Sequence, residues 1–162
     1  MKIFVVYGNM NLDFKTLTNS LKSISHLPEV FIQSGYSEVP KLNKNWQIFD
    51  FIPRKQFLDL ISLSDIIISH AGVGIISEAL KFNKKPIIIA RRKKYNEHTN
   101  DHQFEFLNQY VNDNIFNVFE SGEELLNLIE LKVFLKNPSR RFITNLDPMK
   151  KDLFLYLNKY LN

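Results

Sequence analysis

Short apolar runs alternate with longer amphipathic segments along most of this chain. The runs that predict strands are Ile3–Tyr7, Val30–Gln33, Ile48–Ile52, Asp65–Ser69, Pro86–Ala90 and Ile115–Phe119. Two of them contain three consecutive isoleucines, and such continuous β-branched stretches are typical of strands covered on both faces. We therefore expect a buried parallel sheet.

Helical patterns fill the intervals between these runs. Ser121 and Glu124 form a capping-box pattern, and Phe104, Leu107 and Val111 place an apolar stripe on the preceding segment. Alternating strands and helices predict right-handed βαβ units, so the expected fold class is α/β, a single Rossmann-like domain with a parallel sheet. The predicted helices are Leu12–Ser25, Lys55–Leu63, Ile75–Phe82, Thr99–Val111 and Ser121–Phe134.

The C-terminal segment has a different pattern. Asp147 and Pro148 are typical of a helix start, a capping carboxylate followed by proline at the first helical position. The helix expected after them is apolar on more than one face, so it either packs over the sheet edge or docks on another protein. We predict a Rossmann-like domain over residues 1–135, and a basic connector with a C-terminal docking helix over residues 136–162.

Composition and charge exclude several classes of protein. The 162 residues contain no Cys, which excludes disulfide scaffolds, thiol nucleophiles, zinc ribbons and iron–sulfur clusters. The apolar runs are far shorter than a bilayer span, and the first residues do not resemble a signal peptide, so we expect a soluble intracellular protein. A net charge of +4 is too mild to indicate nucleic-acid binding. The basic run Arg91–Lys94 is a solvated face or meets an anionic partner.

The residues that follow the fourth apolar run offer a candidate phosphate site. In open parallel sheets, ligands lie beyond the carboxyl ends of the strands. Gly72 and Gly74 stand at a strand-to-helix turn, where backbone N–H groups can approach an anion, although a tight turn alone also needs glycine. The pattern is not a dinucleotide fingerprint, because Ser77 occupies the third glycine position, and the chain contains no Walker A motif.

Polar residues near this turn suit a nucleotide or a sugar. Glu78 lies one helical turn beyond Gly74 and could accept ribose hydroxyls, or be an ordinary exposed glutamate. The adjacent Asp101, His102 and Gln103 suit a hydroxyl-rich ligand or cap a helix. His98 and His102 have metal-ligand spacing, but no third ligand follows at a recognisable interval, so we expect no metal site.

Taken together, these motifs resemble a known family. The stretch from Ser69 to Gly74, then Glu78, Lys85–Ile89 and Asp101–Gln103, resembles the nucleotide-sugar-binding half of GT-B glycosyltransferases, in particular the glycosyltransferase family 28 C-terminal domain. Within that family it is similar to the E-type (PssE-like) subunits of two-component bacterial exopolysaccharide and capsule galactosyltransferases. It is also similar to the small subunit of the dolichol-linked N-acetylglucosaminyltransferase. The resemblance covers about residues 1–135.

The resemblance implies a set of residues that bind a UDP-sugar without a cofactor or metal. The glycines and His70 would hold the diphosphate, Glu78 the ribose, and the residues from Asp101 onward the sugar hydroxyls. Asn9 and Ile75 depart from the family pattern, which commonly has Thr and Ser there, so either nucleotide binding would be weaker or the phosphate site would rely on backbone groups. The implied residues are Gly8, His70, Gly72, Gly74, Glu78, Asp101, His102 and Gln103.

The resemblance also implies a partner, because a GT-B enzyme has two Rossmann-like halves and this length supplies one. A membrane-associated subunit would bind the lipid-linked saccharide acceptor and carry the catalytic base. The expected function is donor binding in an inverting hexosyltransferase, with galactose as the sugar, at the cytoplasmic face of the membrane. The alternative is a non-catalytic enhancer of the same complex. A stand-alone epimerase finds no support, because the chain lacks a dinucleotide fingerprint and a suitably placed Tyr-x-x-x-Lys pair.

Overall fold

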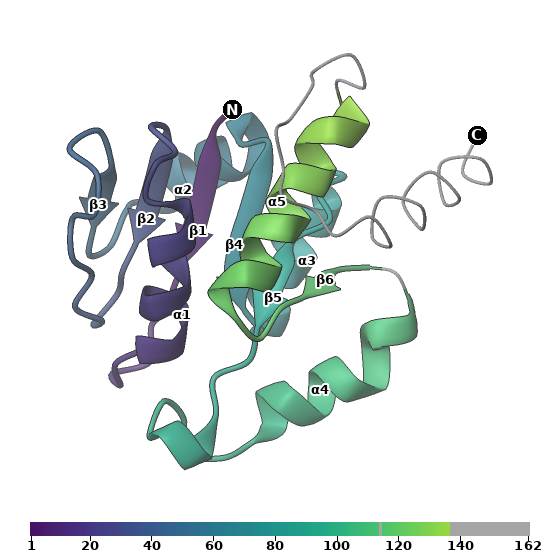
Figure 1. Cartoon of the computed structure of the whole chain (residues 1–162). Helices are drawn as coiled ribbons and strands as arrows, with labels where there is room; N and C mark the ends of the chain where they lie inside the picture. The colour runs from purple at the N-terminus through teal and green to yellow at the C-terminus, as the bar shows by residue number, and fades with distance from the viewer. Residues whose placement is uncertain (114, 137–162) are drawn as a thin grey trace. The chain divides into compact units, whose positions relative to one another are not determined.

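The computed structural model describes residues 1–113 and 115–136, and its centre is a parallel sheet of six strands (Figure 1). Their order across the sheet is β3-β2-β1-β4-β5-β6, which is the doubly wound order of Rossmann-like folds. Each predicted run overlaps one strand, so the α/β prediction is confirmed. The strands are β1 (Ile3–Val6), β2 (Val30–Gln33), β3 (Gln47–Phe49), β4 (Ile66–His70), β5 (Ile87–Ile89) and β6 (Asn117–Val118).

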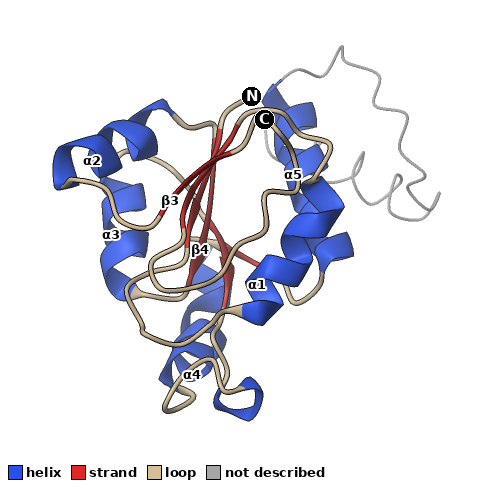
Figure 2. Cartoon of the chain, turned by 90° about the vertical axis from the view of Figure 1, so that its left-hand side faces the viewer, coloured by secondary structure: helices blue, strands red, loops and turns tan. Residues whose placement is uncertain are grey.

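Helices cover both faces of this sheet. Figure 2 shows α1 and the first half of α5 on one face and α2 and α3 on the other, while α4 lies beyond the carboxyl ends of the strands. None of the described helices is long and apolar enough to cross a membrane. The α-helices are α1 (Lys15–Ser20), α2 (Arg54–Leu63), α3 (Val73–Lys81), α4 (His102–Tyr110) and α5 (Gly122–Lys136), with short 3-10 turns η1 (Leu21–Ile24), η2 (Lys93–Tyr95) and η3 (Val111–Asp113).

The isoleucine runs form the centre of the core. β1 pairs with β4 from Ile3↔Ile66 to Val6↔Ser69, and β4 pairs with β5 from Ile68↔Ile87 to His70↔Ile89. Ile67 and Ile68 are at most 1% exposed. On the α2 and α3 side, Ile67 packs with Ile61 and Ile75. Burial of each such side chain contributes roughly 1.5–3 kcal/mol.

Two helix starts show where local hydrogen bonds overrode the sequence pattern. The helix predicted from Thr99 begins at His102, because the Asn100 side chain accepts the His102 N–H and the Asp101 carboxylate accepts the Lys93 N–H. The capping box at α5 forms in part. Ser121 Oγ accepts the Glu124 N–H, but the Glu124 carboxylate accepts the N–H of Glu120 instead of that of Ser121.

The chain divides into two compact units, Met1–Ile129 and Glu130–Asn162. The first contains the whole sheet and every site residue discussed below. In the second unit, the structure describes only the end of α5. The helix predicted after Asp147 lies outside the described residues, and the boundary predicted between residues 135 and 136 stays a prediction.

Candidate functional site

The two central strands create the crevice in which a ligand site is expected. β1 and β4 are neighbours, yet the chain leaves β1 toward α1 on one face and leaves β4 toward α3 on the other (Figure 2). Loops that diverge in this way open a crevice at the carboxyl ends of the strands, which is the usual binding position in doubly wound folds.

Two glycines enclose the imidazole of His70 in this crevice. His70 is the last residue of β4, Gly8 follows β1 and Gly72 precedes α3. A Cβ atom added to Gly8 would lie 2.6 Å from His70 Nε2, and one added to Gly72 would overlap His70 Cε1. Gly8 also has a φ of +86°, which side-chain-bearing residues rarely adopt. We call Gly8, His70 and Gly72 the glycine cradle.

The imidazole in the cradle is neutral near pH 7. Burial, together with the nearby charges of Arg91 and His98, lowers the pKa of His70 to about 4. A neutral imidazole has one N–H donor and one acceptor nitrogen, so the ring can donate a hydrogen bond without adding a charge.

The N-terminus of α3 is open next to the cradle. Gly72 is its N-cap and supplies no side-chain cap, Val73 is 63% exposed, and a Cβ at Gly74 would meet nothing within 4 Å. The free N–H groups and the helix dipole there suit an anion. Ile75 is 6% exposed and packs into the core, so this turn offers an anion backbone groups and no hydroxyl at that position.

Glu78 lies on the same helix and is already engaged. Its Oε1 accepts a hydrogen bond of 2.8 Å from Arg54 Nη2, and Lys81 Nζ lies 3.6 Å away. The hydrogen bond from Arg54 holds the pKa of Glu78 below its usual value, so the carboxylate stays ionised. The Arg54 side chain is 71% exposed, so solvent surrounds most of it and it can move away from Glu78.

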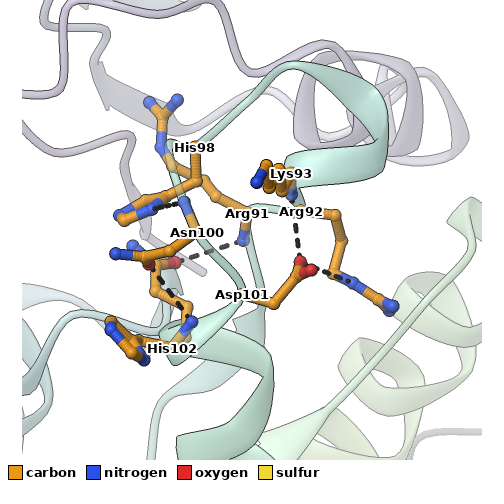
Figure 3. Close-up of polar contacts among 8 residues, drawn as sticks. Arg91, Arg92, Lys93, His98, Asn100, Asp101 and His102 are labelled. Atoms are coloured by element: carbon orange, nitrogen blue, oxygen red, sulfur yellow. Dashed lines mark hydrogen bonds and ion pairs between the residues drawn. The ribbon is translucent and has the colours of Figure 1, made fainter.

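Asp101, His102 and Gln103, the residues predicted to bind sugar hydroxyls, have different surroundings. Asp101 holds the connection between β5 and α4, since its Oδ1 accepts the Lys93 N–H and lies 3.5 Å from Arg92 Nε (Figure 3). The exposed His102 ring pairs with Glu105 at 3.0 Å. Gln103 instead reaches the cradle, with Nε2 3.4 Å from His70 Nδ1. Of the eight predicted residues, the structure thus joins Gly8, His70, Gly72 and Gln103 by direct contact.

A buried polar group under the β5–α4 connection was not predicted. Arg91 is 1% exposed, which corrects the expectation that the basic run is a solvated face or meets a partner throughout. Its guanidinium donates to the carbonyls of Tyr7, Leu12 and Glu97 at 2.8–3.1 Å.

The carboxylate of Glu97 completes this group from the same connection. It is equally buried, and its Oε1 accepts the N–H and hydroxyl of Thr16. We call Arg91, Glu97 and Gln103 the buried clamp. Pattern reasoning missed the first two because charged residues are almost never fully buried unless paired.

Two exposed aromatic rings at the same edge of the sheet were also missed. Tyr36 follows β2 and Phe51 follows β3, and their ring centroids lie 5.2 Å apart in an edge-to-face arrangement. They are 57% and 51% exposed. Phe51 stands three residues before Arg54, so the pair lies close in sequence to the partner of Glu78. Exposed aromatic faces of this kind can stack on a planar base.

The molecule also has a cavity of about 640 Å³, and it is separate from the cradle. It is lined by α1, the β5–α4 connection, α4 and the residues before α5, and none of the cradle residues or Glu78 lines it. Its wall includes Arg92, whose guanidinium covers the Phe104 ring at 3.6 Å. Chemistry favours the cradle as the candidate site, because the anion-binding helix end, the glycines and the imidazole converge there.

Within the described residues, no three His, Asp or Glu side chains gather closely enough to hold a metal ion. Of the predicted pair, His98 Nδ1 accepts the Asn100 N–H, and His102 pairs with Glu105. That a bound sugar nucleotide needs no metal stays a prediction.

Comparison with known proteins gives one family and a set of related folds. The model of the glycosyltransferase family 28 C-terminal domain matches residues 11–144. The structure of the glycotransferase of kitacinnamycin is similar with a TM-score of 0.60 and 16% identity, over 98% of this chain and 38% of that one. The NMR structure of ALG13 is similar with a TM-score of 0.53 and 17% identity, over 94% of each chain. At these identities the two structures show a shared fold. No curated protein matches.

Proposed function

Because this chain belongs to the glycosyltransferase family 28 C-terminal domain family, we propose that it is the donor half of a glycosyltransferase and binds a UDP-sugar at the cradle. The family and the fold support a transferase activity in general. The observation that carries the proposal is the convergence of Gly8, His70 and Gly72 beside the open N-terminus of α3. A diphosphate is the anion that suits this arrangement.

The remaining parts of the nucleotide have natural positions around the diphosphate. Glu78 on α3 accepts the ribose hydroxyls once the exposed side chain of Arg54, at the start of α2, turns away. The Tyr36–Phe51 pair provides apolar surface for the base. The sugar extends toward the start of α4, where Asp101 and His102 offer acceptors and a donor.

The proposed reaction is an inverting transfer. A hydroxyl of the acceptor sugar attacks the anomeric carbon, its proton passes to a base on a second chain, and the bond to the diphosphate breaks as UDP leaves. The N–H groups of α3 and the neutral His70 stabilise the negative charge that accumulates on the leaving oxygen. This chain thus supplies the donor site and the leaving-group stabilisation.

We further propose that the acceptor half is a separate subunit. The chain spans 38% of the kitacinnamycin glycotransferase, which leaves room for a second half in that protein. Apolar side chains that are more than half exposed at the carboxyl edge, Tyr36, Phe51 and Val73, support a docking surface there. That partner would bring the chain to the inner face of the cell membrane.

The finer assignment is a hexosyl transfer in bacterial surface polysaccharide synthesis. Its support is the resemblance of the stretch from Ser69 to Gln103 to E-type subunits, with galactose as the sugar and a lipid-linked saccharide as the acceptor. A non-catalytic enhancer is the second candidate, and two observations favour it. Ile75 offers no hydroxyl to a phosphate, and Glu78 is bound by Arg54 and Lys81.

Calorimetric titration separates these two functions. The purified chain is titrated with UDP, UDP-galactose, UDP-N-acetylglucosamine and, as a mismatched nucleotide, GDP. We expect the uridine ligands to bind and Glu78→Ala to weaken them about tenfold or more, because the ribose loses a charged acceptor. The control is Glu123→Ala, which changes an exposed glutamate on α5. Equal affinity in Glu78→Ala would contradict the proposed site, and no nucleotide binding would favour the enhancer.

A further inference from the structure

The orientation of the Gln103 side-chain amide is determined by its surroundings. Its Oε1 accepts the Ala71 N–H at 3.2 Å and the Arg91 N–H at 3.1 Å, so it joins the ends of β4 and β5. Backbone N–H groups can only donate, and the atom between them must therefore be the amide oxygen. The NH₂ group consequently faces the other way.

That NH₂ group meets the imidazole of His70. Gln103 Nε2 lies 3.4 Å from His70 Nδ1. Since an amide NH₂ can only donate, Nδ1 must be the acceptor nitrogen, and the proton of the neutral ring must reside on Nε2. The low pKa of His70 agrees with a neutral ring.

The Nε2 side of the ring lies inside the cradle. A Cβ at Gly8 would lie 2.6 Å from Nε2, 2.9 Å from Cδ2 and 3.2 Å from Cε1, so the loop after β1 packs over the ring beside Nε2. Gly72, the N-cap of α3, contacts the same ring nearest to Cε1, the atom bonded to Nε2. An anion bound at this helix end would therefore lie beside the ring edge formed by Cε1 and Nε2.

We propose that Gln103 is a positioning residue that holds His70 in the Nε2–H tautomer, so that the ring donates a hydrogen bond to the bound diphosphate. This inference rests on the proposed function for the identity of the anion. It assigns Gln103 to the phosphate end of the ligand, whereas the family resemblance implies a role in reading sugar hydroxyls.

The tautomer is measured directly by two-dimensional ¹⁵N–¹H NMR of the histidine ring nitrogens, on the whole chain without ligand near pH 7. The wild type should show protonated Nε2 at His70. In Gln103→Glu, one carboxylate oxygen still accepts the Ala71 and Arg91 N–H groups, but the other faces Nδ1 and draws a proton to it. A protonated Nδ1 in the wild type, or an unchanged tautomer in Gln103→Glu, would overturn the positioning role.

Binding measurements test the consequence for the ligand. Gln103→Glu should weaken UDP and UDP-galactose by the same factor, about tenfold or more, because the lost hydrogen bond is to the diphosphate common to both. The matched control is Gln109→Glu, which makes the same change at an exposed position of α4. Weaker binding of UDP-galactose alone would restore the sugar-reading role and overturn this one.

The two experiments separate the inference from the proposed function. If the wild type does not bind UDP, the proposed function fails and the diphosphate role fails with it. The NMR result in the free protein still decides whether Gln103 sets the tautomer of His70.

Discussion

The two sides of the candidate site are built by opposite means. In the glycine cradle, the loops after β1 and β4 close on His70 because Gly8 and Gly72 have no side chains. In the buried clamp, the β5–α4 connection is held by long polar side chains: Arg91 donates to three carbonyls, and Gln103 accepts from two N–H groups. The cradle therefore cannot tolerate an added atom, while the clamp cannot tolerate a removed one.

The largest effect should come from removing the centre of the clamp. Arg91→Met leaves three carbonyls and the buried Glu97 without their cation, so we expect a loss of about 3–5 kcal/mol in the free energy of unfolding. Urea denaturation measures it. Lys93→Met, an exposed change in the same basic run, should stay within about 0.5 kcal/mol. A loss below about 1 kcal/mol for Arg91→Met would show that the clamp does not hold the fold.

Lowering the pH should destabilise the folded chain through protonation of His70. Its pKa is about 4 in the folded chain against about 6.5 when unfolded, so the unfolded chain binds the proton first as the pH falls. Stability is therefore lost between about pH 6.5 and pH 4, by about 3 kcal/mol in total. Urea denaturation across this range, compared with His70→Gln, isolates the contribution. Parallel pH profiles of the two proteins would contradict a buried neutral ring.

Replacement by alanine should affect the two glycines of the α3 turn differently. Gly72→Ala places a Cβ against the His70 ring, which must then shift. We expect the free energy of unfolding to fall by about 1–3 kcal/mol, and most of the affinity for UDP to be lost. Gly74→Ala is the matched control, because its Cβ meets nothing and alanine favours the helix, so stability should rise by up to about 1 kcal/mol. Equal thermal denaturation of the two variants would show that the cradle adapts to a side chain.

The smallest effect should come from the surface pair on α2 and α3. Arg54→Ala removes the hydrogen bond that lowers the pKa of Glu78, so that pKa should rise toward its usual value, which NMR titration of the carboxyl carbon follows. The stability should change by less than about 1 kcal/mol, because Arg54 is largely exposed. An unchanged pKa would mean that Lys81 alone holds the carboxylate.

The contrast between the glycine cradle and the buried clamp also explains which features could be predicted from the sequence. The apolar runs predicted the strands, and the isoleucine runs Ile66–Ile68 and Ile87–Ile89 predicted the doubly covered core, because burial on both faces leaves a continuous apolar pattern. Gly72 was found from the strand-to-helix turn, whose position follows from the fold, whereas His70 was implied by the family resemblance. The strands and the glycine turn depend on local sequence and on topology alone.

The clamp depends on contacts between distant residues, and no local pattern reports them. In the sequence, Arg91 looks like part of a solvent-exposed basic run. Only the fold brings the carbonyls of Tyr7 and Leu12, which accept hydrogen bonds from Arg91, close to its guanidinium. The late start of α4 follows from the side chains of Asn100 and Asp101, which bond to the backbone and hold the preceding residues out of the helix. Such competition is decided by tertiary structure.

The central claim is that the cradle, and not the 640 Å³ cavity, binds the nucleotide. The most direct test is amide NMR of the whole chain titrated with UDP. We predict that the largest shifts fall on Gly8, Gly72, Val73 and Gly74, around the open end of α3. Shifts confined to cavity residues such as Thr16, Tyr95 and Phe119 would contradict the account, as would a spectrum that UDP leaves unchanged.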